Sequence, residues 1–201
     1  MKIPPTKLKN YLKEGDILLF KCPSFPKLGW WVAKYTSSEY SHIGLVHFID
    51  NEPYCLEFKE FIGCRVYKLS DYVMQECDRI DVFRTAHHIC FSNSVHNFTE
   101  ETAKNITYEA HKFIGKKYNW KLIFYISLWY IPIVRLFLNT FSKDSDNASS
   151  FICSSFIAFL WRKHFVDLVS NLDDGHTKPG DIARSPLLEK LYTLSCGEEN
   201  E

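Results

Sequence analysis

The stretch SSFICSSFI, residues 149–157, marks the point at which a polar segment gives way to an apolar run. Phe156, Phe159 and Leu160 follow Cys153 at the spacing of the buried face of a helix. The pattern predicts a buried helix that starts near Cys153 and runs to about His164. Free backbone N–H groups at a helix N-terminus carry partial positive charge, which favours the thiolate form of a cysteine. Because the thiolate is the nucleophilic form, Cys153 is the leading candidate for a reactive residue.

Two earlier segments carry the residue types that would activate such a cysteine. Residues 41–46 (SHIGLV) place His42 at the head of an apolar strand, and residues 54–58 (YCLEF) place Glu57 in the next strand. A tight turn at residues 50–53 would pair these strands as a hairpin, so that His42 and Glu57 can face the same side. A nucleophile, a base and an orienting acid are the parts of a cysteine hydrolase.

Strand patterns dominate the first half of the chain and helix patterns the second. Thr99 is a capping hydroxyl followed by an acidic first turn, which predicts a further helix. Residues 178–186 (KPGDIARSP) predict a turn that leads into a final short strand or helix. We predict an α+β fold, in which an antiparallel sheet packs against helices, in a single domain over residues 1–201. The predicted strands cover residues 17–20, 43–49, 54–58, 65–69 and 79–84.

The bulk composition limits the class of protein. Lys and Arg together number 24, as do Asp and Glu, so the net charge of +0 gives no indication of nucleic-acid binding. The cysteines are odd in number and scattered, which argues against a disulfide framework and for a reducing compartment. None of them has zinc-knuckle spacing, and residues 87–90 (HHIC) are more simply interpreted as an exposed strand end. We therefore expect no metal and no other cofactor. The seven cysteines are Cys22, Cys55, Cys64, Cys77, Cys90, Cys153 and Cys196.

Residues 122–138 (LIFYISLWYIPIVRLFL) form the most apolar part of the chain. The block is at the lower length limit for a membrane span and contains Pro132 and Arg135. We interpret it as a buried or groove-lining helix pair broken near Pro132, with contact at a membrane interface as the alternative and a span as the third option. The N-terminus lacks the apolar core of a secretory signal, which predicts a cytoplasmic location with membrane association through residues 122–138 as an option.

Taken in chain order, six short segments resemble the circularly permuted branch of the NlpC/P60 superfamily of papain-like cysteine hydrolases. The resemblance is greatest to the YiiX-like proteins and their poxvirus relatives. In ordinary papain-like folds the cysteine helix precedes the histidine strand, whereas here it follows. The resemblance implies that Cys153 is the nucleophile, His42 the general base and Glu57 the acid that orients the imidazole. The six segments cover residues 15–20 (GDILLF), 41–45 (SHIGL), 56–57 (LE), 115–120 (GKKYNW), 151–154 (FICS) and 179–186 (PGDIARSP).

The resemblance also implies a reaction class. The expected activity is hydrolysis or acyl transfer at an amide or ester of a peptide-like or lipid-like (N-acyl) substrate, through a thioester. The same branch also resembles the relatives of lecithin:retinol acyltransferase, which use the same parts on lipid substrates. Tyr118 is expected to bind substrate as a hydroxyl donor or pocket wall and Trp30 to line the cleft, although both residues also suit simple packing.

Two other functions remain open from the sequence. One is a catalytically silent papain-like module that binds a partner or a membrane surface through residues 122–138. The other is a deubiquitinase-like protease, which the chain supports less because it has no recognisable ubiquitin-binding insert. The sequence gives no indication of oligomeric state.

Overall fold

The computed structural model describes seven ranges of the chain. They are residues 5–21, 38–71, 79–86, 88–91, 94–117, 152–170 and 172–194. Two predicted substrate-binding residues, Trp30 and Tyr118, and the apolar block 122–138 lie outside the described residues.

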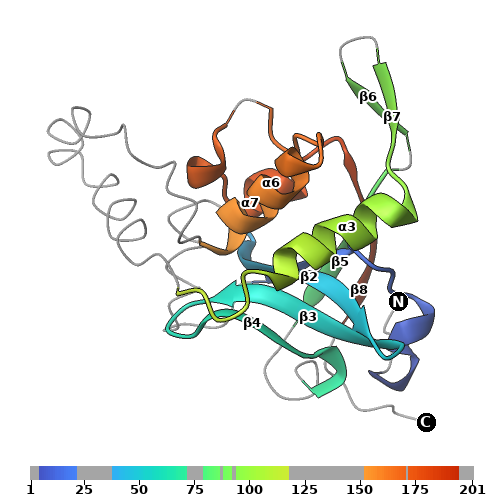
Figure 1. Cartoon of the computed structure of the whole chain (residues 1–201), viewed down its shortest axis with the longest axis vertical. Helices are drawn as coiled ribbons and strands as arrows, with labels where there is room; N and C mark the ends of the chain where they lie inside the picture. The colour runs from blue at the N-terminus through green and yellow to red at the C-terminus, as the bar shows by residue number, and fades with distance from the viewer. Residues whose placement is uncertain are drawn as a thin grey trace, which may run out of the picture.

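A six-stranded antiparallel sheet forms the centre of the fold (Figure 1). Its strand order is β4-β3-β2-β1-β5-β8, so the strand that carries His42 lies inside the sheet. A separate hairpin of β6 and β7 projects away from the body. All five predicted strands are present, with ends that differ by a few residues. The strands are β1 (Ile17–Lys21), β2 (Tyr40–Ile49), β3 (Glu52–Lys59), β4 (Gly63–Lys68), β5 (Ile80–Thr85), β6 (His88–Phe91), β7 (Ser94–Asn97) and β8 (Leu188–Leu194).

The turn between β2 and β3 is as tight as the sequence predicts. Asp50 and Asn51 have φ values of 51° and 62°, and Ile49 pairs with Glu52 on either side of them. Positive φ at both central residues is the geometry of a type I′ turn, which Asp and Asn tolerate better than most residues. This turn fixes the register of β2 against β3 and therefore the relative positions of His42 and Glu57.

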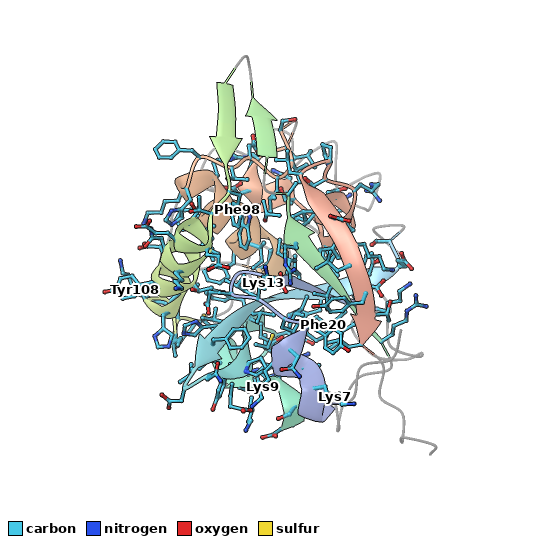
Figure 2. The ribbon with its side chains drawn as sticks, turned by 90° about the vertical axis from the view of Figure 1, so that its right-hand side faces the viewer. Lys7, Lys9, Lys13, Phe20, Phe98 and Tyr108 are labelled. Atoms are coloured by element: carbon cyan, nitrogen blue, oxygen red, sulfur yellow. The ribbon has the colours of Figure 1, made fainter. Side chains whose placement is uncertain are left out.

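In the described part of the chain, one face of the sheet is covered by the helices α3 (Glu100–His111), α6 (Cys153–Lys163) and α7 (Pro179–Ala183) (Figure 1). Helix α3 begins where the sequence predicts, since the Thr102 N–H donates to Thr99 Oγ1 at 3.1 Å. It ends at His111. Tyr108 on α3 points away from the sheet into solvent (Figure 2). The short helix η2 (Asp174–His176) lies between α6 and α7 in the chain.

The helix-side core is built around α6. The ring of Phe156 packs against that of Phe58 on β3 with centroids 4.7 Å apart, and Trp161 is fully buried. Trp161 Nε1–H also donates to Thr85 Oγ1 on β5 at 3.0 Å. These contacts fix α6 to the sheet at both ends of the helix.

The opposite face of the sheet has its own smaller apolar layer. Leu8 and Leu12 pack there with Leu18 and Phe20 of β1. The first of these leucines belongs to η1 (Pro5–Asn10), the 3₁₀ helix that also carries Lys7 and Lys9 (Figure 2). The sheet is thus covered on both faces, which is why its central strands read as continuous apolar runs.

The α+β class predicted from the sequence is confirmed. Within the described ranges, no helix is both long enough and apolar enough to cross a membrane.

Candidate active site

His42 and Glu57 lie just beyond the paired part of the β2–β3 hairpin. The ladder between the two strands runs from Ile49 opposite Glu52 to Leu45 opposite Leu56. Past this point the side chains of His42 and Glu57 meet, with Nε2 of the ring 2.5 Å from Oε2 of the carboxylate. Glu57 is 0% exposed and His42 is 7% exposed, so this is a buried contact between an acid and a base.

Gly44 makes room for this arrangement. A Cβ atom at Gly44 would lie 2.5 Å from Sγ of Cys55, closer than real Cβ contacts come, and 3.5 Å from the ring of Phe20. The Phe20 ring in turn lies 5.2 Å, centroid to centroid, from the imidazole of His42. The glycine in the sequence His42-Ile43-Gly44 is therefore required by close packing next to the histidine.

Cys153 is the first residue of α6, as the sequence predicts. The first turn is closed by Ser155, whose Oγ accepts from Ile152 N–H at 3.0 Å. Ser154 Oγ donates to the Thr177 carbonyl at 2.6 Å, which ties the start of α6 to the segment that leads into α7. The first N–H groups of any helix have no acceptor within the helix, so the backbone around Cys153 offers free donors.

Cys153 reaches the imidazole of His42. The cysteine side chain lies close enough to the ring to be, with Glu57, one of the two side chains that raise the pKa of His42. Glu57 engages Nε2 of His42, so Nδ1 is the ring nitrogen that remains for a further partner. Cys153 is 8% exposed. The structure therefore brings together Cys153, His42 and Glu57, although their catalytic roles stay a prediction.

The charges in this cluster favour an ion pair. Burial alone would raise the pKa of Glu57, but the facing His42 lowers it to about 2. Burial alone would lower the pKa of His42, but Glu57 and then Cys153 raise it to about 10. A carboxylate and an imidazolium are thus the forms present near neutral pH.

These shifts link the pair to folding stability. The contribution of Glu57 is complete above its ordinary pKa of 4.5 and is lost as the pH falls towards about 2. The contribution of His42 is complete below its ordinary pKa of 6.5 and is lost as the pH rises through about 10. Both contributions are therefore complete only between these two ordinary values.

Arg65 and Tyr67 on β4 complete the surroundings of the carboxylate, and neither is a sequence-predicted site residue. Arg65 stands directly opposite Glu57 in the β3–β4 ladder. Its Nε and one terminal nitrogen lie 2.8 Å and 2.7 Å from Glu57 Oε1. The Tyr67 hydroxyl lies 3.5 Å from Oε2. Their signal in the sequence is an arginine and a tyrosine at alternate positions of the strand that follows Glu57.

Two other cysteines in the described ranges differ from Cys153. Cys55 and Cys64 are buried in the two core layers. Burial raises the pKa of the Cys64 thiol to about 12 and that of Cys55 well above its ordinary value. Neither thiol is therefore suited to react as a thiolate near neutral pH.

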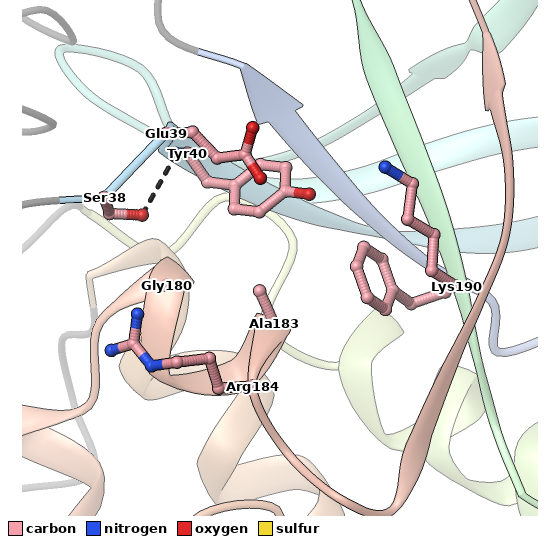
Figure 3. A pocket seen from close by; sticks show the side chains of 8 residues that line it. Ser38, Glu39, Tyr40, Gly180, Ala183, Arg184 and Lys190 are labelled. Atoms are coloured by element: carbon pink, nitrogen blue, oxygen red, sulfur yellow. Dashed lines mark hydrogen bonds between the residues drawn. The ribbon is translucent and has the colours of Figure 1, made fainter.

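A pocket of about 470 Å³ opens where β2 begins, two residues before His42 (Figure 3). Tyr40 and Glu39 form one wall and α7 with Arg184 forms another. Lys190 of β8 lies on a further side. The lining residues are Ser38, Glu39, Tyr40, Phe83, Gly180, Ala183, Arg184 and Lys190.

Asp81, a fully buried residue of β5, holds two of the pocket side chains in place. Its carboxylate accepts from the Tyr40 hydroxyl at 2.7 Å, from Lys190 Nζ at 2.6 Å and from Thr193 Oγ1 at 2.6 Å. Burial would raise the pKa of Asp81, but these donors, Lys190 first, lower it. The pocket therefore has a rigid polar wall next to the rings of Tyr40 and Phe83.

Comparison with known proteins finds a solved structure with a similar fold. No known family profile matches the chain, and no curated protein matches it either. Among solved structures, the crystal structure of the metalloprotein YiiX from Escherichia coli O157:H7, a DUF1105 protein, matches with a TM-score of 0.59. The match covers 90% of this chain and 96% of that chain at 14% sequence identity. The chain therefore has a YiiX-like α+β fold, and at this identity the likeness extends to the fold alone.

Proposed function

We propose that the chain is a cysteine-dependent hydrolase or acyltransferase that acts on an amide or ester bond. The observation that carries the proposal is the contact of Cys153, at the start of α6, with a buried His42 that is itself paired with Glu57. The order of these elements also supports a circularly permuted papain-like fold of the NlpC/P60 type, since α6 follows the histidine strand in the chain. The YiiX-like fold agrees with this assignment at the level of architecture.

The first half of the proposed reaction forms a thioester. His42 holds the proton of Cys153 at Nδ1 as an ion pair, and the thiolate attacks the carbonyl carbon of the substrate. The carbonyl oxygen becomes an oxyanion, for which the Cys153 backbone N–H is a donor at the helix start. The imidazolium then gives its proton to the leaving amine or alcohol as the carbon–nitrogen or carbon–oxygen bond breaks.

The second half releases the acyl group. Neutral His42 removes a proton from water, or from an acceptor alcohol or amine, which attacks the thioester carbonyl. The carbon–sulfur bond breaks, the thiolate returns and the acid, ester or amide leaves. Throughout, Glu57 holds Nε2–H of the ring and stabilises the imidazolium by its charge.

The proposed substrate carries a peptide-like or lipid-like acyl group. The pocket beside β2 combines the rings of Tyr40 and Phe83 with the charged ends of Arg184 and Lys190, which suits a group with both apolar and polar parts. Contact of residues 122–138 with a membrane surface belongs to the same proposal.

Metal chemistry is not part of the proposal, although the structural neighbour YiiX is described as a metalloprotein. Glu57 Oε1 is bound by Arg65 and Oε2 by His42, so a guanidinium already occupies the cation position at this carboxylate. In the part of the chain that the structure describes, no three His, Cys, Asp or Glu side chains cluster as a metal site. Both oxygens of Glu57 therefore already have a cationic partner.

Covalent labelling with an acyl electrophile tests the proposal. We expect the wild-type protein to be labelled at Cys153 and the Cys153→Ala variant to lose that label. Cys64→Ala is the matched control, because it removes a core thiol whose raised pKa keeps it unreactive, and it should label like the wild type. Equal labelling of Cys153→Ala and wild type contradicts the proposal. A folded wild type without any label supports the catalytically silent binding module instead.

A further inference from the structure

We propose that Arg65 is a positioning residue of this site, which holds the Glu57 carboxylate in place and charged while His42 carries the catalytic proton. The inference rests on the proposed function, because it assigns Arg65 to the same reaction. Arg65 acts through Glu57 and not on the substrate, and it was not a candidate from the sequence.

The guanidinium of Arg65 binds one oxygen of the Glu57 carboxylate through two nitrogens. Two nitrogens of the guanidinium, Nε and a terminal nitrogen, lie 2.8 Å and 2.7 Å from Glu57 Oε1. The other oxygen, Oε2, is left for Nε2 of His42 at 2.5 Å. Each oxygen therefore has its own cationic partner, and a rotation of the carboxylate would break both contacts at once.

The fold holds Arg65 in this position. Arg65 and Glu57 are directly opposite in the β3–β4 ladder, so their side chains leave the sheet next to each other. The guanidinium carbon lies 4.7 Å from the ring centroid of Tyr67, two residues along the same face. The Arg65 side chain is 28% exposed, while the Glu57 side chain is 0% exposed. The Arg65 side chain therefore lies partly in solvent while its guanidinium contacts the buried carboxylate of Glu57.

The site needs a second cation beside Glu57 to keep the proton on His42. A buried acid with an imidazole as its only partner can take the proton from the imidazolium and leave both groups neutral. A neutral imidazole would then no longer place a positive charge beside Cys153. The guanidinium cannot give up a proton, so its charge keeps Glu57 ionised and leaves the proton on His42.

The groups around the pair of Glu57 and His42 come from strands β2, β3 and β4 and from helix α6. The titratable and charged residues among them are His42 on β2, Cys55 and Lys59 on β3, Cys64, Arg65 and Tyr67 on β4, and Cys153 on α6. Arg65 is the one residue in this described set whose charge is fixed and whose nitrogens bond the carboxylate directly.

The test compares three variants of the full-length chain. Arg65→Met removes the charge and keeps the length of the side chain. Arg65→Lys keeps the charge but loses the two-nitrogen contact, and it also serves if Arg65→Met fails to fold. Lys68→Met is the matched control, because it removes a positive charge from the same strand at a residue paired with exposed Glu52. Two quantities are measured against pH: the carbon-13 shift of the Glu57 carboxyl group by NMR, and the rate of iodoacetamide alkylation of Cys153 by mass spectrometry.

We expect the protonation midpoint of Glu57 to rise by about one pH unit or more in Arg65→Met, since a neighbouring cation lowers a carboxyl pKa by roughly that amount. The acid limb of the alkylation profile should move upwards with it. Arg65→Lys should lie between Arg65→Met and the wild type, and Lys68→Met should match the wild type in both measurements. A purely structural role would change stability without moving these two midpoints together.

The outcomes distinguish a failure of the positioning role of Arg65 from a failure of the proposed function. If wild-type Cys153 is alkylated fast at pH 6 but Arg65→Met leaves either midpoint unchanged, the positioning role is wrong and the proposed function stands. If Arg65→Met is unfolded, Arg65→Lys decides the question. Midpoints identical to the wild type in both measurements would show that the two-nitrogen contact of Arg65 with Glu57 is not needed. If wild-type Cys153 reacts no faster than an ordinary thiol, the proposed function is wrong and the positioning role fails with it.

Discussion

Replacing His42 with alanine is expected to slow the alkylation of Cys153 by iodoacetamide about 100-fold at pH 6. An ordinary cysteine, with a pKa of about 8.5, is less than about 1% thiolate at this pH. In the wild type, the charged ring of His42 lies beside Cys153, and a cation next to a cysteine favours nucleophilic attack by its sulfur. The difference between wild type and variant should disappear near pH 10, where an ordinary thiol is ionised as well. The rate is measured cysteine by cysteine with mass spectrometry.

His47→Ala is the matched control for this experiment. His47 lies on the same strand as His42, but its Nδ1 is bonded to Glu14 Oε1 at 2.7 Å and its ring packs against His111, away from Cys153. The variant should therefore alkylate like the wild type. An unchanged Cys153 rate in His42→Ala would show that the histidine does not activate the cysteine.

Replacing Trp161 with alanine is expected to lower the free energy of unfolding by about 3–5 kcal/mol, the usual range for truncating a buried aromatic residue to alanine. Trp161 is 0% exposed and is part of the core between α6 and the sheet. The substitution also removes the donor to Thr85 Oγ1, which is itself buried. Because α6 carries Cys153 at its other end, the loss weakens the element that presents the nucleophile.

Urea unfolding measures this effect, and Trp161→Phe is its control. The phenyl ring keeps part of the buried area but loses the hydrogen bond and one ring of the indole, so the expected loss is smaller, about 1–3 kcal/mol. A Trp161→Ala variant as stable as Trp161→Phe would mean that the packing of α6 on the sheet contributes little.

The parts of the site that could be predicted from the sequence are set by local chemistry. Asp50 and Asn51 predict a tight turn on their own, and the turn alone brings the strands of His42 and Glu57 together. The change from polar to apolar residues before Cys153 predicts the start of α6 within a residue. Both signals act over a few positions, so no knowledge of the remaining fold is needed.

The partner of Glu57 could not be predicted, because it depends on strand register. The sequence predicts the strand after Glu57 at residues 65–69, whereas β4 begins at Gly63. A register error of one residue moves every side chain to the opposite face. Without the correct turn length, Arg65 cannot be placed against Glu57, although a buried acid already implies that some cation must lie near it.

The pocket wall around Asp81 depends on contacts still further apart in the chain. Lys190 and Thr193 bond Asp81 from 109 and 112 residues away, and Tyr40 from 41 residues away. In the sequence, Asp81 appears only as one acid inside an apolar strand. Its role becomes visible only when β8 is placed next to β5 at the edge of the sheet.

The protonation state of the His42 ring tests the central claim most directly. Nitrogen-15 NMR of histidine-labelled protein, with the His42 signals assigned by their loss in His42→Ala, follows the ring across a pH titration. We expect a ring protonated on both nitrogens through pH 8 with a midpoint of about 10, and a lower midpoint in Cys153→Ala, because Cys153 is one cause of the raised pKa. A ring that titrates near its ordinary pKa of 6.5, or that is unaffected by Cys153→Ala, would contradict the ion pair on which the proposed chemistry depends.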